Sequence, residues 1–444
     1  MKVVHVGNVA NIAYLNTKFL RRLGMEADLY YYDFDLCLAQ PEWEDAQIEG
    51  IVNLGDPDWR KKVELTNYEP PFWVHPINMT VRQGALTVKI PFASAHGSRL
   101  ERFLYKWQYR VNRLIPAWHQ YQIIRQSFAR RQLNIKLTLK DSIFYFDIYR
   151  FREIVQDYDL VQAYGLEPIS CLVDFPQKPY IAYEFGTMRE IPFEGSLRGQ
   201  LLAAAYQQAN RVIITNPDVR PLAEKLGLRN YVFIPHPIDE EKFCPGPSKI
   251  RDKLEAQFGK DVIILFAPAR HDWAEKGTDK MIRAVARLTR EQRSLIILLM
   301  LITWGQDVQR SKSLIAQEGI EKQVLWLPLL PKMQMVEYYR AADIVLDQFN
   351  IGTFGLTTPE AMACGKPVVV YFEPQIHQWC FSEMPPLVEA QTEEEIYERL
   401  KELLKDPTRR KRLGEQSRAW IVRHHGWRRV AEEHIRLYRE IVQE

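Results

Sequence analysis

The chain has 444 residues, which predicts two or three domains at roughly 100–200 residues each. Its hydrophobic content of 46% and charged content of 26% are typical of globular proteins and argue against disorder, collagen or coiled coil. The net charge of +3 is too small to argue for a nucleic-acid partner. The longest apolar run, residues 295–304, is about half a membrane span, and too few apolar residues follow Lys2 for a signal peptide.

The cysteines indicate a reducing environment. Cys37, Cys171, Cys244, Cys364 and Cys380 are scattered along the chain and form no C-x-x-C pair. This pattern disfavours a disulfide framework or a zinc site and favours a cytoplasmic location. We therefore expect neither a bound metal nor a resident cofactor.

Alternating apolar runs and helical patterns predict two series of βα units. In the first, an apolar run from Val3 to Gly7 precedes a helical pattern up to Leu23 and a second apolar run over residues 27–32. In the second, strands are expected at 262–269, 295–302, 324–327, 344–346 and 366–371, and helices at 278–289, 308–318 and up to Ala341. Such units build parallel sheets covered by helices. The expected fold class is therefore α/β, with two Rossmann-like, doubly wound domains.

A proline-rich stretch, residues 234–249, separates the two series. Its four prolines, Pro235, Pro237, Pro245 and Pro247, exclude a regular helix or an interior strand. A surface loop would show the same composition, but its position between the two series predicts a domain boundary. We therefore expect an N-terminal domain over residues 1–240 and a C-terminal domain over residues 241–426.

The segment GTFGLTTPEAMACGKPVVVY, residues 352–371, carries the clearest functional motif. Thr358 as N-cap and Pro359 as first helical residue predict a helix start. The backbone N–H groups just before it, in Phe354, Gly355, Leu356 and Thr357, would then face a phosphate at the strand ends. Glu360 in the first turn is placed to accept hydrogen bonds from ribose hydroxyls. An ordinary amphipathic helix, with a capping Thr and a Glu that complements the helix dipole, would show the same pattern.

The stretch FGLTTPEAMACGKPVV resembles the nucleotide-sugar signature of retaining, family-4-type glycosyltransferases of the GT-B fold, the glycosyl transferases group 1. Three further stretches resemble the same family in order and spacing: residues 266–285, the linker IPHPIDEEKFCPG and residues 338–348. The resemblance implies two Rossmann-like domains with a cleft between them. It also implies transfer of a sugar from a nucleoside diphosphate, with UDP the expected nucleotide, to a hydroxyl acceptor that is lipid-linked or a glycan.

The resemblance assigns roles to residues of both expected domains. Arg270 and Lys276 match the residues that hold the donor diphosphate, and Gly277 lets their loop approach it. Arg, Lys and helix-end amides suit a metal-independent site, because they meet the negative charge of the leaving group with preorganised donors. A solvated surface pair is the alternative for Arg270 and Lys276. The N-terminal domain is expected to bind the acceptor, and Gly7 and Asn8 after the first strand are weaker candidates for donor binding.

Two departures from the family pattern concern the sugar. Gly352 stands where the family carries the first Glu of a Glu-(seven residues)-Glu pair, and Asp347 or Gln348 are candidates to replace it. The family's His after the fourth strand is also missing. Tyr164, Glu184 and Arg189 are the candidates that this region offers instead, with Glu184 assigned to catalysis and the others to the sugar or acceptor. A simple ion pair is the alternative for Glu184 and Arg189.

The tract from Arg99 to Lys136 combines nine Lys and Arg with a single acid, Glu101, and with interleaved Trp, Tyr and Phe. This composition suits a solvated helical face, an interfacial helix pair on an anionic membrane, or stacking on single-stranded nucleic acid. We expect no nucleic-acid partner, whereas a peripheral site at the inner membrane face would fit a lipid-linked acceptor.

The last segment, residues 427–444, places Trp427, Val430, His434, Leu437, Tyr438 and Ile441 near helical spacing. The resemblance implies that this helix crosses back to the N-terminal domain; the alternative is a helix that caps the C-terminal domain. Two other functions remain open from sequence. A non-catalytic nucleotide-sugar-binding protein is suggested by Gly352, and a dinucleotide oxidoreductase is disfavoured because GNVANI is not G-x-G-x-x-G.

Overall fold

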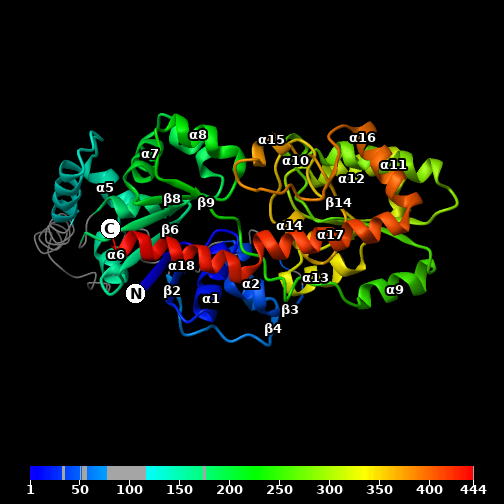
Figure 1. The fold of residues 1–444 in the computed structure, drawn as a ribbon, viewed down its shortest axis with the longest axis horizontal. Helices are drawn as coiled ribbons and strands as arrows, with labels where there is room; N and C mark the ends of the chain where they lie inside the picture. The colour runs from blue at the N-terminus through cyan, green and yellow to red at the C-terminus, as the bar shows by residue number, and fades with distance from the viewer. Residues whose placement is uncertain (33–35, 51, 53–57, 78–116, 174–176, 444) are drawn as a thin grey trace, which may run out of the picture.

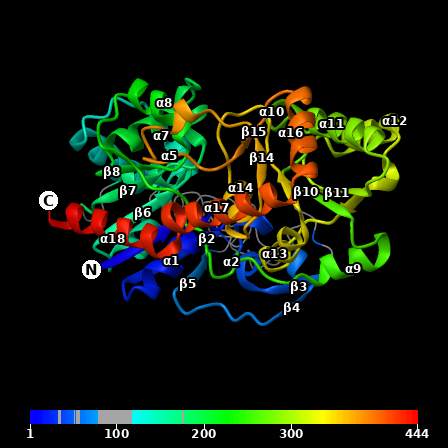
Figure 2. The same ribbon diagram turned by 45° about the vertical axis from the view of Figure 1, so that its right-hand side comes forward.

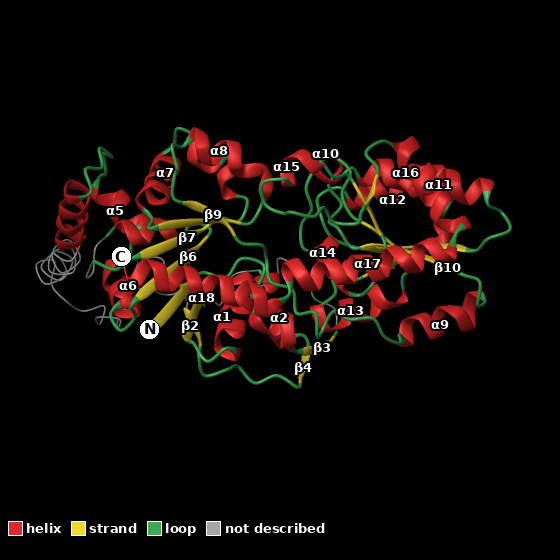
Figure 3. Cartoon of the chain, viewed as in Figure 1, coloured by secondary structure: helices red, strands yellow, loops and turns green. Residues whose placement is uncertain are grey.

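The computed structural model describes residues 1–32, 36–50, 52, 58–77, 117–173 and 177–443. Two parallel sheets organise these residues, one in each half of the chain, and helices cover them (Figures 1 and 3). The expected α/β class with two Rossmann-like sets of βα units is confirmed. Among the described helices, none is both long and apolar enough to cross a membrane.

The first sheet has seven parallel strands. Their order is β5 (Val74–Ile77), β2 (Glu26–Tyr32), β1 (Lys2–Val6), β6 (Leu160–Tyr164), β7 (Tyr180–Tyr183), β8 (Arg211–Ile214) and β9 (Tyr231–Phe233). Around it lie α1 (Ile12–Arg22), α5 (Leu139–Tyr145), α6 (Ile148–Val155), α7 (Leu197–Gln208) and α8 (Arg220–Lys225). Val3 on β1 lies opposite Ala27 on β2 and Leu160 on β6, so the strand order reverses between β1 and β6. Parallel sheets bind ligands beyond the carboxyl ends of strands at such a reversal.

The second sheet has six parallel strands. Their order is β12 (Val324–Leu327), β11 (Ile297–Ile302), β10 (Ile263–Ala267), β13 (Ile344–Leu346), β14 (Val368–Val370) and β15 (Val388–Glu389). The helices of this half are α9 (Lys249–Phe258), α10 (Trp273–Lys276), α11 (Thr278–Glu291), α12 (Val308–Glu318), α13 (Lys332–Ala341), α14 (Thr357–Ala363), α15 (Pro374–His377), α16 (Glu393–Lys405) and α17 (Pro407–His425). The order reverses between β10 and β13, and the loops that follow these strands carry most of the predicted donor residues.

A segment between β2 and β5, called the excursion below, leaves the first sheet and packs on the second domain. It comprises α2 (Pro41–Asp45), β3 (Gln47–Glu49) and β4 (Glu64–Thr66), and Figures 1 and 3 show it beneath α13. The buried side chains of Trp43, Ile48 and Trp59 belong to the same hydrophobic cluster as β10 and α13, and Gln334 donates a 2.6 Å hydrogen bond to the Ile48 carbonyl. The domain boundary expected near residue 240 therefore does not separate two independent cores.

The chain crosses between the two halves at two adjacent points. Ile238 of the linker forms a parallel bridge with Gly426, and its N–H donates a 2.8 Å hydrogen bond to the His425 carbonyl. After Gly426, α18 (Trp427–Gln443) runs back along the first domain beside α1 (Figures 1 and 2). Trp427 stacks on Phe19 of α1 at 5.4 Å between ring centroids, and the buried face of α18 shares a hydrophobic cluster with β1 and α1.

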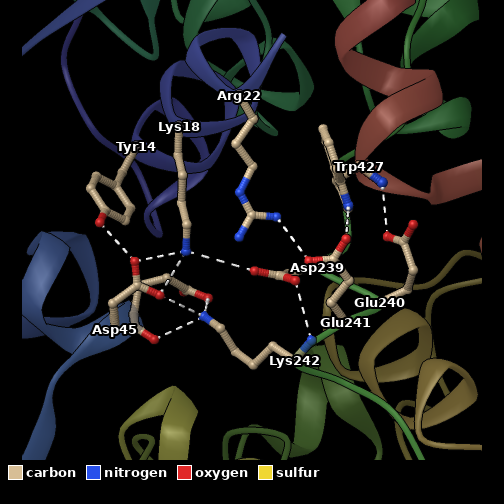
Figure 4. Close-up of polar contacts among 10 residues, drawn as sticks. Tyr14, Lys18, Arg22, Asp45, Asp239, Glu240, Glu241, Lys242 and Trp427 are labelled. Carbon is tan, nitrogen blue, oxygen red and sulfur yellow. Dashed lines mark hydrogen bonds and ion pairs between the residues drawn. The ribbon is translucent and has the colours of Figure 1, made fainter.

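Polar side chains fasten the first crossing to the N-terminal domain (Figure 4). Lys242 Nζ lies 2.7 Å from a Glu44 carboxylate oxygen and 2.9 Å from one of Asp45, both on α2. Lys18 of α1 pairs with the same Asp45 at 2.8 Å and with Asp239 at 3.6 Å. Consecutive linker residues, 239–242, thus contact α1, α2 and the start of α18, where Glu240 accepts the Trp427 N–H at 2.9 Å.

Candidate functional site

Lys276 lies at the carboxyl edge of the second sheet, in the loop region that follows β10. Its Nζ donates to the Gln348 side chain, and the Gln348 amide donates in turn to the carbonyl of Thr353. The loop after β13 is thus tied to the lysine through one buried glutamine. Burial lowers the pKa of Lys276, and repulsion from Arg270 and Arg189 lowers it further. The attraction of Asp347 opposes this shift. An anionic group beside this lysine would relieve that repulsion.

Arg270 and Gly277 flank the short helix α10. The Arg270 guanidinium pairs with Asp272 at 3.4 Å and with Glu275, and its side chain is 39% exposed, so it can turn towards an anion. Gly277 has φ +63°, and a Cβ there would lie 3.1 Å from Phe349 Cβ and from Asn350 Oδ1. A side chain at this position would therefore be strained and would push the two loops apart.

The helix of the signature motif begins earlier than expected. Leu356, not Thr358, is the N-cap of α14, and the Thr358 hydroxyl donates a 2.7 Å hydrogen bond to Asp347. The capping prediction for Thr358 is wrong because its hydroxyl has a stronger, charge-assisted partner at the end of β13. Asp347 is buried beside Lys276, and burial raises its pKa while the lysine opposes that rise.

Glu360 is enclosed between α13 and α14. Its carboxylate accepts from Lys332 Nζ and, at 3.1 Å, from the Tyr339 hydroxyl. Burial raises the pKa of Glu360 and Lys332 opposes this. A carboxylate has about four acceptor sites, so these two bonds leave acceptor capacity for hydroxyl groups. The structure thus places Glu360 at the expected turn of the helix and adds two partners that the sequence did not reveal.

The remaining donor candidates form the loop between β13 and α14. Phe354 stacks on Phe372 and on His377, at 6.0 and 5.5 Å between ring centroids. Gly355 is exposed, and Leu356 and Thr357 lead into the helix. Gly352 is buried against Glu373, as described below. These residues line one continuous loop at the carboxyl edge, as a donor-binding loop would require.

The N-terminal domain contributes residues that follow β7 and β8. The Glu184 carboxylate is fully buried and accepts from the Met188 N–H at 3.3 Å and from Asn216 at 3.4 Å. Burial raises its pKa to about 7. Its carboxylate accepts the Met188 N–H and so holds the loop that carries Arg189, and its catalytic assignment stays a prediction.

Arg189 is paired within its own domain and lies near enough to the C-terminal domain to interact with its charges. It forms two hydrogen bonds with Asp218, of 2.7 and 2.9 Å, and its charge interacts with Glu275 and Lys276 of the other domain. Asp218 in turn acts on His377 of the C-terminal domain. The carboxyl edges of the two sheets therefore face each other, with Arg189 on one side and the Arg270–Lys276 loop on the other.

Three N-terminal candidates lie elsewhere. Tyr164 is 1% exposed, and its hydroxyl contacts His5, Asn16 and Gln162 at 2.6–3.0 Å inside the first domain. It is the last residue of β6 and points into the core, so its assignment to the sugar or acceptor is corrected to a structural one.

Asn8 is also structural. Its amide donates to the Ala39 carbonyl at 2.7 Å, and its oxygen accepts from the Tyr14 N–H at 3.1 Å. Gly7 has φ +84°, and a Cβ there would meet the Glu167 side chain at 2.8 Å. Both residues shape the turn after β1, which is a different role from the donor contact expected of them.

Lys332, Asp218 and His377 were not foreseen from the sequence. Each follows or lies near the carboxyl end of a strand, which is a weak signal on its own because many polar residues occupy such positions. In the part of the chain that the structure describes, no group of three or more His, Cys, Asp or Glu side chains is placed to hold a metal ion.

Comparison with protein families matches residues 249–420 to "Glycosyl transferases group 1". Among characterised proteins, the D-inositol 3-phosphate glycosyltransferase of Kineococcus radiotolerans is 27% identical over 257 residues, which cover 54% of this chain and 59% of that protein. Mannosylfructose-phosphate synthase of Agrobacterium fabrum is 28% identical over 192 residues, 41% of this chain and 42% of that protein. The matched segments thus span about half the length of these relatives.

Solved structures match the whole chain. Sucrose-phosphate synthase from Thermosynechococcus elongatus superposes with a TM-score of 0.61 and 17% identity, over 99% of both chains. HepE from Anabaena, solved with UDP and glucose, superposes with a TM-score of 0.63 and 13% identity, over 99% of this chain and 100% of that one. At these identities the likeness shows the fold alone. The chain therefore has the GT-B fold, and its residues 249–420 match the model of the glycosyl transferases group 1, the family that its motifs resemble.

Proposed function

We propose that the protein is a glycosyltransferase that moves a hexose-type sugar from a nucleoside diphosphate, with UDP as the nucleotide, to a hydroxyl acceptor with retention of configuration. The observation that carries this proposal is the placement of Arg270 and Lys276 at one carboxyl edge, facing Arg189 at the other. Cations at both edges would suit a leaving diphosphate, because they would stabilise the negative charge that develops on it once Arg189 and Arg270 exchange their carboxylate partners for it. The family match of residues 249–420 supports the same assignment.

The two domains would divide the substrates. The C-terminal domain, around residues 241–426, would bind the nucleotide sugar through the loop that contains residues 352–357 and through Glu360, whose carboxylate would accept ribose hydroxyls. The N-terminal domain would bind a lipid-linked or glycan acceptor near Arg189. We propose no cofactor and no metal, and a reducing, cytoplasmic location, which suits the five free cysteines of the structure.

The direct test is a thermal-shift screen of UDP-glucose, UDP-galactose, UDP-N-acetylglucosamine and GDP-mannose, since a ligand that binds the native state raises its apparent stability. We expect a UDP-sugar to stabilise the protein most, and to be slowly hydrolysed or transferred, also in chelator. The anomeric configuration of the product, measured by NMR, tests retention. Binding of a nucleotide sugar without any turnover would instead favour a non-catalytic binding protein, and binding of none of the four would contradict the proposal.

We also propose that part of the basic, aromatic tract touches an anionic membrane surface. Residues 99–116 of the tract lie outside the described residues. Residues 117–130 are helical, and beside them Trp118, Phe144 and Tyr149 are 55, 76 and 49% exposed. Large exposed aromatic side chains next to basic residues are typical of interfacial helices.

Sedimentation with vesicles of phosphatidylglycerol tests this surface, and vesicles of phosphatidylcholine are the matched control. We expect the protein to sediment with the anionic vesicles, and the double variant Trp118→Ser, Phe144→Ser to bind them at least about a hundredfold more weakly, because burial of each ring in the interface contributes roughly 1.5–3 kcal/mol. If the wild type stays in solution with both vesicle types, the tract is a solvated surface.

A further inference from the structure

The space that a side chain at position 352 would occupy is filled by Glu373. A Cβ built on Gly352 would lie 2.6 Å from Glu373 Oε1, 2.7 Å from its Cγ and 2.8 Å from its Cδ. Gly352 does not have a left-handed φ, so the backbone itself does not require glycine here. A larger residue would displace the side chain of this glutamate, which follows β14 and extends over the loop after β13.

Backbone hydrogen bonds hold Glu373 against this loop, and one side-chain contact orients its carboxylate. Its N–H donates a 2.9 Å hydrogen bond to the Gly352 carbonyl, and the Tyr371 hydroxyl donates to its carboxylate. His377 joins the two loops, since its Nδ1 lies 3.0 Å from the Glu373 carbonyl and its Nε2 lies 3.2 Å from the Thr353 hydroxyl. The Glu373 backbone is therefore held against residues 352–354, and the Tyr371 hydroxyl orients its carboxylate.

This position belongs to the proposed donor site. The Thr353 carbonyl accepts from Gln348, which binds Lys276, so the loop that Glu373 covers is the one tied to the diphosphate lysine. On the other side, Trp379, just beyond α15, donates a 3.2 Å hydrogen bond to the Pro217 carbonyl of the N-terminal domain. Glu373 is half-buried, and the single bond from Tyr371 uses only one of about four acceptor sites on its carboxylate.

We propose that Glu373 binds the hydroxyl groups of the transferred sugar, and that it supplies from a different loop the carboxylate that Gly352 cannot. This inference rests on the proposed function. A carboxylate accepts hydrogen bonds from vicinal hydroxyls, and its charge stabilises the positive charge that develops on the anomeric carbon as the diphosphate leaves. Tyr371 is then a positioning residue, because its hydroxyl orients the carboxylate.

The first experiment compares Glu373→Gln and Glu373→Ala with the wild type, using the UDP-sugar that stabilises the protein most in the thermal-shift screen. We expect kcat/KM to fall roughly 10- to 100-fold, as for loss of a charge-assisted hydrogen bond, while the Kd of UDP alone, measured by calorimetry, stays unchanged. The control is Glu389→Gln, an exposed glutamate on the neighbouring strand β15, which should match the wild type. Wild-type kcat/KM in Glu373→Ala would overturn the inference.

The second experiment moves the carboxylate. Gly352→Glu alone should be poorly active, because its side chain collides with Glu373. Gly352→Glu combined with Glu373→Ala removes the collision, and we expect this double variant to be at least about tenfold more active than Glu373→Ala. A folded double variant that is no more active than Glu373→Ala would show that a carboxylate at position 352 cannot replace that of Glu373, and would contradict the inference. Absence of turnover in the wild type would contradict the proposed function itself. An active wild type whose kcat/KM is unchanged by the Glu373 substitutions would contradict only this inference.

Discussion

Lys276→Ala and Arg270→Ala are each expected to reduce kcat by about 10²-fold or more, the usual size for removal of one preorganised donor to a developing negative charge. Lys276 is half-buried and already repelled by Arg270 and Arg189, so its ammonium group would gain most when negative charge develops on the diphosphate. Arg270 is more exposed and gives up its pairs with Asp272 and Glu275 to reach the same group.

Binding measurements separate this role from simple nucleotide affinity. Both variants should bind UMP, which lacks the second phosphate, nearly as well as the wild type does in calorimetry. Glu360→Gln should show the opposite pattern, with UMP affinity reduced about tenfold because a charge-assisted hydrogen bond to ribose is weakened. Lys253→Ala, a charge change on the exposed face of α9, is the control and should alter neither quantity. Wild-type turnover in the Lys276 and Arg270 variants would contradict the diphosphate assignment.

The order of strands and helices in the C-terminal half was readable from the sequence because each buried strand is a short apolar run between polar helices. The run at residues 295–302 became β11 (Ile297–Ile302), and the expected helix 308–318 is α12. Parallel strands buried on both faces leave such a signal locally. Their carboxyl ends then locate the loops that follow them, and the residues that the family resemblance singled out, Lys276 and Asp347, lie just beyond β10 and β13.

Contacts between segments that are far apart in the chain leave no such local signal in the sequence. The excursion that carries Trp43 and Trp59 packs on the second domain, although its sequence lies wholly within the first. Tyr164 was misassigned because the sequence does not show that its hydroxyl finds partners on β1, α1 and β6 inside the first domain. Glu373 was missed because it stands far from Gly352 in the sequence, and only the fold of the two loops brings them together.

Lys242→Met is expected to lower the free energy of unfolding at pH 7 by about 3–5 kcal/mol, the range for loss of one partner of a buried ion pair. The lysine ammonium is enclosed by Glu44 and Asp45, and Asp239 lies beside them (Figure 4). Methionine fills a similar volume but leaves two carboxylates, those of Glu44 and Asp239, buried with less compensating charge. Chemical denaturation monitored by fluorescence measures the change. Lys61→Met, which removes an exposed ion pair with Asp58, is the control and should leave unfolding unaltered.

The pH dependence of this loss identifies its cause. Burial alone would raise the pKa of Asp45, but Lys242 and Lys18 hold it well below its usual range. In the wild type this carboxylate therefore contributes stability above its unfolded pKa, and that contribution is lost as the pH falls towards the folded pKa. Without Lys242 the folded pKa of Asp45 moves up, so acidification relieves the variant, whereas the wild type loses the Asp45 contribution as the pH falls below about 4. The two unfolding free energies should converge on acidification. An equal difference at pH 7 and at about pH 3 would mean that lost packing, and not unpaired charge at the crossing between the domains, destabilises the variant.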